Sequence, residues 1–156
     1  MSNTKIIIQA RTGSTRLPRK MILPFYENEG IFSLLLKKLT SAFDKNDIIL
    51  ATSVNENNDV LVEIAEKYGI NYFRGSENDV LQRFIDAAKE FNAENIIRVC
   101  ADNPFLDVFY IRLLIEKFEK FNCDYLSYIT SDGTPSIKTH YGFWAEAVKL
   151  SALEKV

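Results

Sequence analysis

At 156 residues, the chain is long enough for one domain with its own hydrophobic core. Its residues are 47% hydrophobic and 26% charged, which is ordinary for a globular protein. The formal net charge of −2 argues against broad nucleic-acid binding, which requires a basic face. The sequence has no apolar run near the ~20 residues of a membrane span and no signal-peptide pattern at its start, so we expect a cytoplasmic protein that does not enter a membrane.

Apolar residues follow two periodicities, and the two alternate along the chain. Short continuous runs favour buried strands, whereas spacings of three and four residues favour helices with one apolar face. We expect strands at 6–8, 48–51, 70–73, 96–100 and 124–129, and helices at 31–43, 60–68, 80–91 and 107–121. Each connection is long enough for a right-handed βαβ unit. The alternation therefore predicts an α/β, Rossmann-like fold with a parallel sheet that helices cover on both faces.

The pattern is less regular after residue 130. A turn cluster at 131–135 is followed by a further strand expected within 140–148 and by the beginning of a helix at 150. This helix pattern reaches the last residue without a cap or a breaker. We therefore expect residues 1–156 to form a single domain whose C-terminal part is missing.

A basic loop follows the first strand. It combines small residues with cations: Arg11, Gly13, Ser14, Thr15, Arg16, Arg19 and Lys20. A buried strand that ends in such a loop is typical of phosphate binding in α/β proteins. The loop therefore predicts a nucleotide site.

Neither of the two common glycine-rich phosphate loops fits this segment. The GxGxxG turn and the GxxxxGK[ST] loop both need a second glycine, and Gly13 is the only glycine before Lys20. Met21 also stands where the second pattern has serine or threonine. The loop must therefore rely on its cationic side chains, because arginine binds phosphate with two parallel hydrogen bonds and lysine adds a compact charge.

A second candidate site lies just beyond the strand expected at 96–100. Asp102 follows this strand, and Pro104 prevents the strand from continuing. Ligands of open α/β sheets bind outside the carboxyl ends of the strands, and Mg²⁺ is bound by one or two carboxylates together with substrate phosphates. Asp102 is therefore a candidate magnesium ligand, the alternative being that it caps a turn ahead of Pro104. Arg98 needs a carboxylate partner or a ligand phosphate, and we favour the carboxylate.

Three ordered stretches, QARTGSTRLPRK, GSENDVLQRF and IIRVCADNPFLD, resemble the cytidylyltransferase family that makes CMP-activated acidic sugars. They are most similar to the spore-coat polysaccharide (SpsF-like) group, with Kdo and acylneuraminate cytidylyltransferases as more distant relatives. The resemblance extends from about Lys5 to the end of the chain. It implies a three-layer nucleotide-diphospho-sugar transferase fold, with a mostly parallel sheet, that uses CTP and Mg²⁺.

The resemblance also assigns roles to residues. It implies catalytic roles for Arg11, Lys20 and Asp102, with Asp102 as the metal ligand. In the basic loop it implies contacts with the triphosphate from Ala10, Arg11, Gly13, Ser14, Thr15, Arg16 and Lys20. Near the base or ribose it places Gly75, Ser76, Asp79 and Arg83.

The chain departs from the family pattern at two positions. Ala101 stands where the family usually has glycine, a small change that the loop can tolerate. In the segment from Gly142 to Glu146, Trp144 replaces an aspartate that helps to hold metal in related enzymes. Tryptophan cannot ligate Mg²⁺, so this segment is not expected to supply a second carboxylate ligand through position 144.

The resemblance implies transfer of CMP from CTP to an acidic or amino sugar, with release of pyrophosphate, for surface polysaccharide biosynthesis. The sequence identifies no general base, since His140 is the only histidine and lies in the irregular part of the chain. Two alternatives stay open: a shortened, non-catalytic nucleotide-binding module, and a glycosyltransferase that uses a finished nucleotide sugar. A homodimer is one assembly that the resemblance allows.

Overall fold

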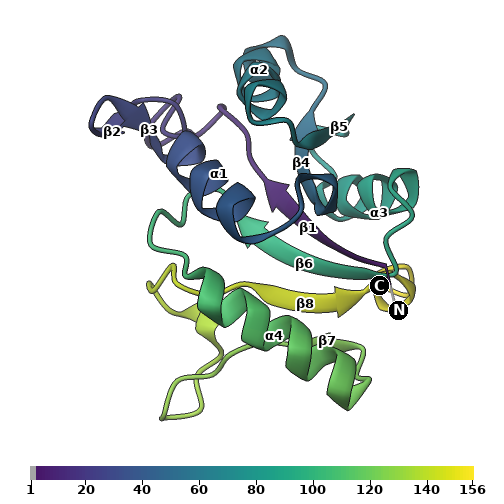
Figure 1. Cartoon of the computed structure of the whole chain (residues 1–156). Helices are drawn as coiled ribbons and strands as arrows, with labels where there is room; N and C mark the ends of the chain where they lie inside the picture. Colours follow the sequence, from purple (N-terminus) through teal and green to yellow (C-terminus); the bar gives the residue numbers. More distant parts are fainter. Residues whose placement is uncertain (1–2) are drawn as a thin grey trace.

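The computed structural model describes residues 3–156, which form a six-stranded sheet in the order β5-β4-β1-β6-β8-β7 (Figure 1). Four neighbouring strands are parallel: β1 (Thr4–Gln9), β4 (Ile48–Ser53), β5 (Asn71–Gly75) and β6 (Asn95–Cys100). Two further strands, β8 (Glu146–Lys149) and β7 (Tyr125–Leu126), extend the sheet. Strand β8 is antiparallel to both β6 and β7. The predicted mostly parallel sheet is confirmed.

The central strands are buried on both faces, as their continuous apolar runs predict. In β1, Ile7 and Ile8 are fully buried, and all six residues of β4 are buried. Ile6 pairs with Ile48 of β4 on one side and with Ile97 of β6 on the other. Strand β1 therefore lies in the middle of the core, with its carboxyl end between those of β4 and β6.

Helices cover both faces of the sheet and complete three layers (Figure 1). The α-helices are α1 (Ile31–Ala42), α2 (Asp59–Tyr68), α3 (Val80–Glu90), α4 (Val108–Phe121) and α5 (Leu150–Leu153). Helices α1, α2 and α4 pack on one face, and α3 with α5 packs on the other. Short 3₁₀ helices form at η1 (Lys45–Asp47), η2 (Glu56–Asn58) and η3 (Ser136–Lys138). Within residues 3–156, no helix has the length and apolar character needed to cross a membrane.

Two of the five α-helices in the described part of the chain have a side-chain cap at the N-terminus, α3 and α4. Asp107 caps α4, and Gly69 ends α2 with a left-handed φ of 73°. Asp79 caps α3 by accepting a hydrogen bond from Gln82 N at 2.9 Å, and the helix begins at the next residue, Val80. The side chain of Asn58 does not cap α2, because it holds the basic loop instead.

Three segments differ from the sequence predictions. The strand expected at 124–129 shrinks to Tyr125–Leu126 at the sheet edge, and it runs antiparallel to its neighbour. The strand expected within 140–148 covers only Glu146–Lys149, because the preceding residues form the wall of a cavity. Before α1, a hairpin of β2 (Pro24–Tyr26) and β3 (Glu29–Gly30) forms where no strand was expected. Strand direction and pairing depend on distant partners, which explains why local patterns did not predict them.

Candidate functional site

The loops after β1 and β6 enclose a cavity of about 450 Å³ at the carboxyl edge of the sheet. It lies where β1 has β4 on one side and β6 on the other, a switch point at which open α/β sheets bind ligands. We call it the first cavity. Its lining residues are Gln9, Ala10, Arg11, Ser14, Thr15, Arg16, Leu17, Lys20, Met21, Arg98, Cys100 and Asp102.

The three residues expected to be catalytic all line the first cavity. Lys20 and Asp102 come from opposite sides of it, with Lys20 Nζ 3.3 Å from Asp102 Oδ2. Arg11 and Arg16 are exposed, and their side chains make no ion pair and no hydrogen bond within residues 3–156. The cavity therefore holds two unpaired guanidinium groups, which suits an anionic ligand. Arg19 is exposed on the surface and does not line it.

The basic loop is shaped around Thr12, a residue that sequence reasoning missed. The buried Thr12 N donates to Asn58 Oδ1 at 2.8 Å, and Thr12 Oγ1 donates to Asn57 O at 2.9 Å. Thr12 O accepts from the backbone N–H groups of Ser14 and Arg19. The turn before α2 thus fixes the loop, through a contact between Thr12 and Asn58, which are 46 positions apart and which no local pattern in the sequence connects.

The turn between β5 and α3 packs beside the basic loop but does not line the first cavity. A Cβ added to Gly13 would lie 4.0 Å from Glu77 Oε1, so the loop and the turn are neighbours. Gly13 itself, with Gly75, Ser76, Asp79 and Arg83, is outside the cavity lining. The structure therefore brings together only seven of the residues assigned by resemblance: Ala10, Arg11, Ser14, Thr15, Arg16, Lys20 and Asp102.

Arg83 is fully buried, and it organises this turn from inside. Its Nη1 donates to the carbonyl oxygen of Ser76, while Nε and Nη2 have no hydrogen-bond partner within the described residues. Burial lowers the pKa of the Arg83 guanidinium; the Glu77 carboxylate opposes this shift without cancelling it, and the Arg11 cation adds to it. A Cβ on Gly75 would lie 2.8 Å from the Phe73 ring, so the turn has no room for a side chain there. Ser76 and Asp79 are the exposed members of the set.

A second cavity of about 180 Å³ adjoins the first, and sequence reasoning had not assembled it. It shares Arg98, Cys100 and Asp102 with the first cavity. Its other lining residues come mainly from the segment before β8: Asn103, Ser136, Ile137, Thr139, His140, Tyr141, Gly142, Trp144 and Glu146. A Cβ on Gly142 would lie 2.5 Å from Asn103 Oδ1, which shows how closely the two loops approach each other.

Arg98 has the carboxylate partner that we favoured. Its Nη1 lies 2.6 Å from Glu146 Oε2, and the Tyr125 hydroxyl donates to Glu146 Oε1. Burial raises the pKa of Tyr125, and the hydrogen bond to Glu146 raises it further. The nearby Trp144 ring contacts Tyr110, Tyr128, Tyr141 and Phe143, and so forms both an aromatic cluster and a wall of the second cavity.

No group of three or more histidine, cysteine, aspartate or glutamate side chains within residues 3–156 is arranged to hold a metal ion. Asp102 is the carboxylate that lines the first cavity, and its side chain is 48% exposed. Glu146 lines only the second cavity, where Arg98 and Tyr125 occupy its oxygens. A metal ion at this site would therefore depend on one protein carboxylate together with ligand oxygens.

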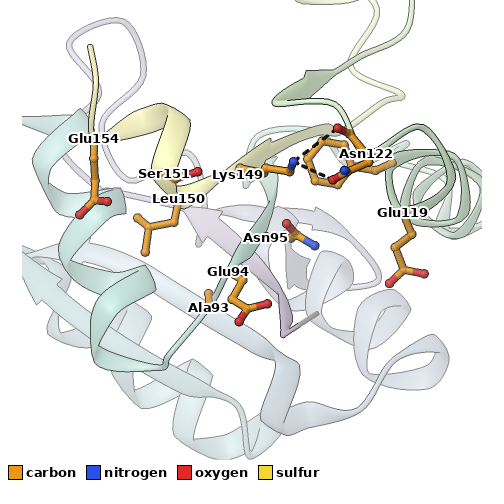
Figure 2. Close-up of a pocket in the computed structure, with 10 residues that line it drawn as sticks. Ala93, Glu94, Asn95, Glu119, Asn122, Lys149, Leu150, Ser151 and Glu154 are labelled. Carbon is orange, nitrogen blue, oxygen red and sulfur yellow. Dashed lines mark hydrogen bonds between the residues drawn. The ribbon is translucent and has the colours of Figure 1, made fainter. Parts of the chain in front are cut away.

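A further cavity, of about 700 Å³, lies near the amino end of β6, at the opposite edge of the sheet. Figure 2 shows it between the start of β6, the end of α4 and α5. Lys149 Nζ donates to Asn122 Oδ1 at 2.8 Å across this cavity. None of the residues predicted from the sequence as site residues lines it.

The three-layer arrangement is that of the nucleotide-diphospho-sugar transferase fold. A solved cytidylyltransferase from Leptospira borgpetersenii superposes with a TM-score of 0.87 at 33% identity, covering 99% of this chain and 63% of that one. A model of the cytidylyltransferase family matches residues 5–150. The chain belongs to the cytidylyltransferase family.

The relationships within the family agree with the resemblance seen in the sequence. The spore coat polysaccharide biosynthesis protein SpsF of Bacillus subtilis is 38% identical over 128 residues, which cover 80% of this chain and 53% of SpsF. The 3-deoxy-manno-octulosonate cytidylyltransferase of Chlorobium chlorochromatii is more distant, at 27% identity over 118 residues, covering 74% of this chain and 46% of that protein. The chain spans about half the length of the curated relatives it matches.

Proposed function

We propose that the protein transfers CMP from CTP to an acidic or amino sugar, with release of pyrophosphate, for the biosynthesis of a surface polysaccharide. The observation that carries the proposal is that unpaired Arg11 and Arg16 face Asp102 around one cavity, in a chain of the cytidylyltransferase family. Because CTP is a cytoplasmic metabolite, we place the reaction in the cytoplasm.

The first cavity would bind the triphosphate. Arg11, Arg16 and Lys20 are the cations that can hold the β- and γ-phosphates, through hydrogen bonds that charge makes about twice as strong as neutral ones. A protein that catalyses phosphoryl transfer needs to form few covalent bonds itself; it aligns the attacking and leaving groups and neutralises the developing charge. These side chains would therefore hold the leaving pyrophosphate and stabilise the charge it gains.

Asp102 fits the magnesium role that the family resemblance implies. Its Oδ1 makes no hydrogen bond within residues 3–156, and the half-exposed carboxylate faces the cavity. One carboxylate is sufficient when substrate phosphates supply the other ligands. A bound Mg²⁺ would supply further neutralisation of the phosphate oxygens.

The second cavity would bind the acceptor sugar. In the transfer, a hydroxyl oxygen of the sugar attacks the α-phosphorus of CTP. The bond from that phosphorus to the bridging oxygen breaks, and its electron pair leaves with pyrophosphate. His140 lines the second cavity and would accept the hydroxyl proton. The turn with Ser76 and Asp79 would lie near the base or ribose.

The test combines a binding measurement with a reaction assay. Calorimetric titration with CTP and Mg²⁺ should show saturable binding, and a screen of 3-deoxy-2-keto acids and amino sugars should identify an acceptor that releases pyrophosphate. Arg112→Ala is a matched control, since Arg112 lies on α4, donates to Ala42 O and does not line the first cavity. It should behave as the wild type.

Each of the other outcomes would indicate a different function for this protein. Tight CTP binding without pyrophosphate release from any sugar would indicate a non-catalytic nucleotide-binding module. Sugar transfer from a nucleotide sugar, without pyrophosphate, would indicate a glycosyltransferase. A protein that does not bind CTP would refute the proposal.

A further inference from the structure

The side chain of Arg98 lies on the boundary between the two cavities. Arg98, Cys100 and Asp102 are the residues that line both of them. Arg98 and Cys100 are two positions apart on β6, so they face the same side of the sheet, and Asp102 follows at the strand's end. Of these three boundary residues, Arg98 is the only cation.

The guanidinium group of Arg98 is held in place on two sides. Nη1 is bound to Glu146 Oε2 at 2.6 Å, and the guanidinium carbon lies 6.0 Å from the centre of the Phe84 ring. Glu146 is in turn fixed by the Tyr125 hydroxyl and is nearly buried. This negative charge therefore sits behind Arg98, away from the first cavity, whose lining does not include Glu146.

The rest of the guanidinium is available to a ligand. The Nε and Nη2 atoms of Arg98 make no hydrogen bond within residues 3–156, and its side chain is 31% exposed. Burial by itself lowers the pKa of Arg98, but Cys100 in its ionised thiolate form and the Glu146 carboxylate outweigh burial and raise the pKa above its ordinary value. The Arg98 guanidinium at the cavity boundary is therefore a preorganised cation whose Nε and Nη2 can donate hydrogen bonds to a ligand.

We propose that Arg98 is a further catalytic residue that binds the α-phosphate of CTP, and that Glu146 and Tyr125 position it. This inference rests on the proposed function. In an in-line transfer the acceptor hydroxyl attacks the α-phosphorus from the side opposite to the pyrophosphate, which leaves as its bond to that phosphorus breaks. With the triphosphate in the first cavity and the acceptor in the second, the α-phosphate lies at their shared boundary. A fixed cation there stabilises the charge on the α-phosphate oxygens as the bonds change.

Binding measurements can test this role without knowledge of the acceptor. Calorimetry would compare cytidine, CMP, inorganic pyrophosphate and CTP, each with Mg²⁺. Arg98→Ala should weaken CMP binding about tenfold or more, because a charge-assisted hydrogen bond is lost. It should leave the binding of cytidine and pyrophosphate unchanged. Arg16→Ala should show the reverse pattern, with weaker pyrophosphate binding and unchanged CMP binding.

Further variants separate a ligand contact from a structural role. Added guanidine at millimolar concentration should restore CMP binding to Arg98→Ala, which a merely loosened fold would not show. Glu146→Gln and Tyr125→Phe should cause smaller losses of the same selective kind. If thermal unfolding shows that Arg98→Ala does not fold, Arg98→Lys keeps the charge without the planar fork, and it should still weaken CMP more than cytidine.

Different results would contradict the proposed function and the role of Arg98. If the wild-type protein does not bind CTP, the proposed function fails. If it binds CTP and CMP while Arg98→Ala binds CMP as tightly as the wild type, only the role of Arg98 is overturned. Equal weakening of CMP and cytidine by Arg98→Lys would overturn it as well.

Discussion

Lys20 and Asp102 lie 82 positions apart in the chain, yet Nζ of the lysine is 3.3 Å from Oδ2 of the aspartate. The two side chains come from the loops after β1 and β6 and face each other across the first cavity. Exposed ion pairs contribute only about 0–1 kcal/mol to stability, so the fold does not depend on this one. We infer that the pair separates when CTP binds, with Lys20 turning to a phosphate and Asp102 to Mg²⁺.

Lys20→Met should weaken CTP binding about tenfold, because a charged hydrogen bond to phosphate is lost while the aliphatic stem is kept. The free energy of unfolding should change by less than about 0.5 kcal/mol, because the site is on the surface. Calorimetric titration with CTP and urea unfolding measure the two effects. Lys67→Met, an exposed change on α2, is the control and should alter neither. Unchanged CTP affinity in Lys20→Met would remove this lysine from the phosphate site.

Asp102→Asn should abolish the dependence of CTP binding on Mg²⁺, since the amide is a neutral and much weaker ligand for a hard cation. Titrations with CTP at increasing Mg²⁺ concentrations measure this dependence. Without Mg²⁺ the variant should bind CTP at least as tightly as the wild type, because one negative charge beside the phosphates is gone. Asp107→Asn, at the N-terminal cap of α4, is the control and should keep the Mg²⁺ dependence of the wild type. A variant at position 102 that retains the full Mg²⁺ dependence would show that the metal is held elsewhere.

The strongest local patterns in the sequence predicted most of the fold. The run from Ile6 to Ile8 predicted the buried central strand, and apolar spacing predicted helices at 80–91 and 107–121, which the structure has as Val80–Glu90 and Val108–Phe121. Such patterns succeed because a strand or a helix face is defined by residues that are close in sequence. The direction of β7 and β8 could not be predicted, because it is set by pairing with strands far along the chain.

The site was predicted only in part for the same reason. Phosphate-loop cations and Asp102 could be found because each lies in a recognisable local stretch. The contacts that assemble the site join distant positions: Thr12 with Asn58, and Arg98 with Glu146, 46 and 48 residues apart. Arg83 was assigned to the nucleotide from its motif, whereas its side chain is buried beneath the turn. Burial of this kind depends on packing, which one sequence does not reveal.

Asn58→Ala should destabilise the protein by about 1–3 kcal/mol, because it leaves the buried Thr12 N–H without its acceptor. CTP binding should weaken too, since hydrogen bonds to Thr12 hold the loop that carries Arg11 and Arg16. Urea unfolding and CTP titration at a temperature where the variant is folded measure these changes. Asn57→Ala is the matched control, because only the backbone carbonyl of Asn57 bonds to Thr12. If both variants behaved alike, the loop would not depend on the Asn58 side chain.

Tyr125→Phe should flatten the dependence of stability on alkaline pH. Burial and the hydrogen bond to Glu146 raise the pKa of Tyr125 above the ordinary value of 10.0, so the folded state holds this proton more tightly than the unfolded state. The resulting stabilisation is complete below the unfolded pKa and is lost as pH rises through the folded pKa. From about pH 9 to about pH 11 the free energy of unfolding should therefore fall, and it should fall less steeply in Tyr125→Phe. Urea unfolding across this range measures the slopes, with Tyr72→Phe on the exposed side of β5 as the control that should follow the wild type. Parallel slopes for Tyr125→Phe and the wild type would mean that the contact between Tyr125 and Glu146 does not persist in solution.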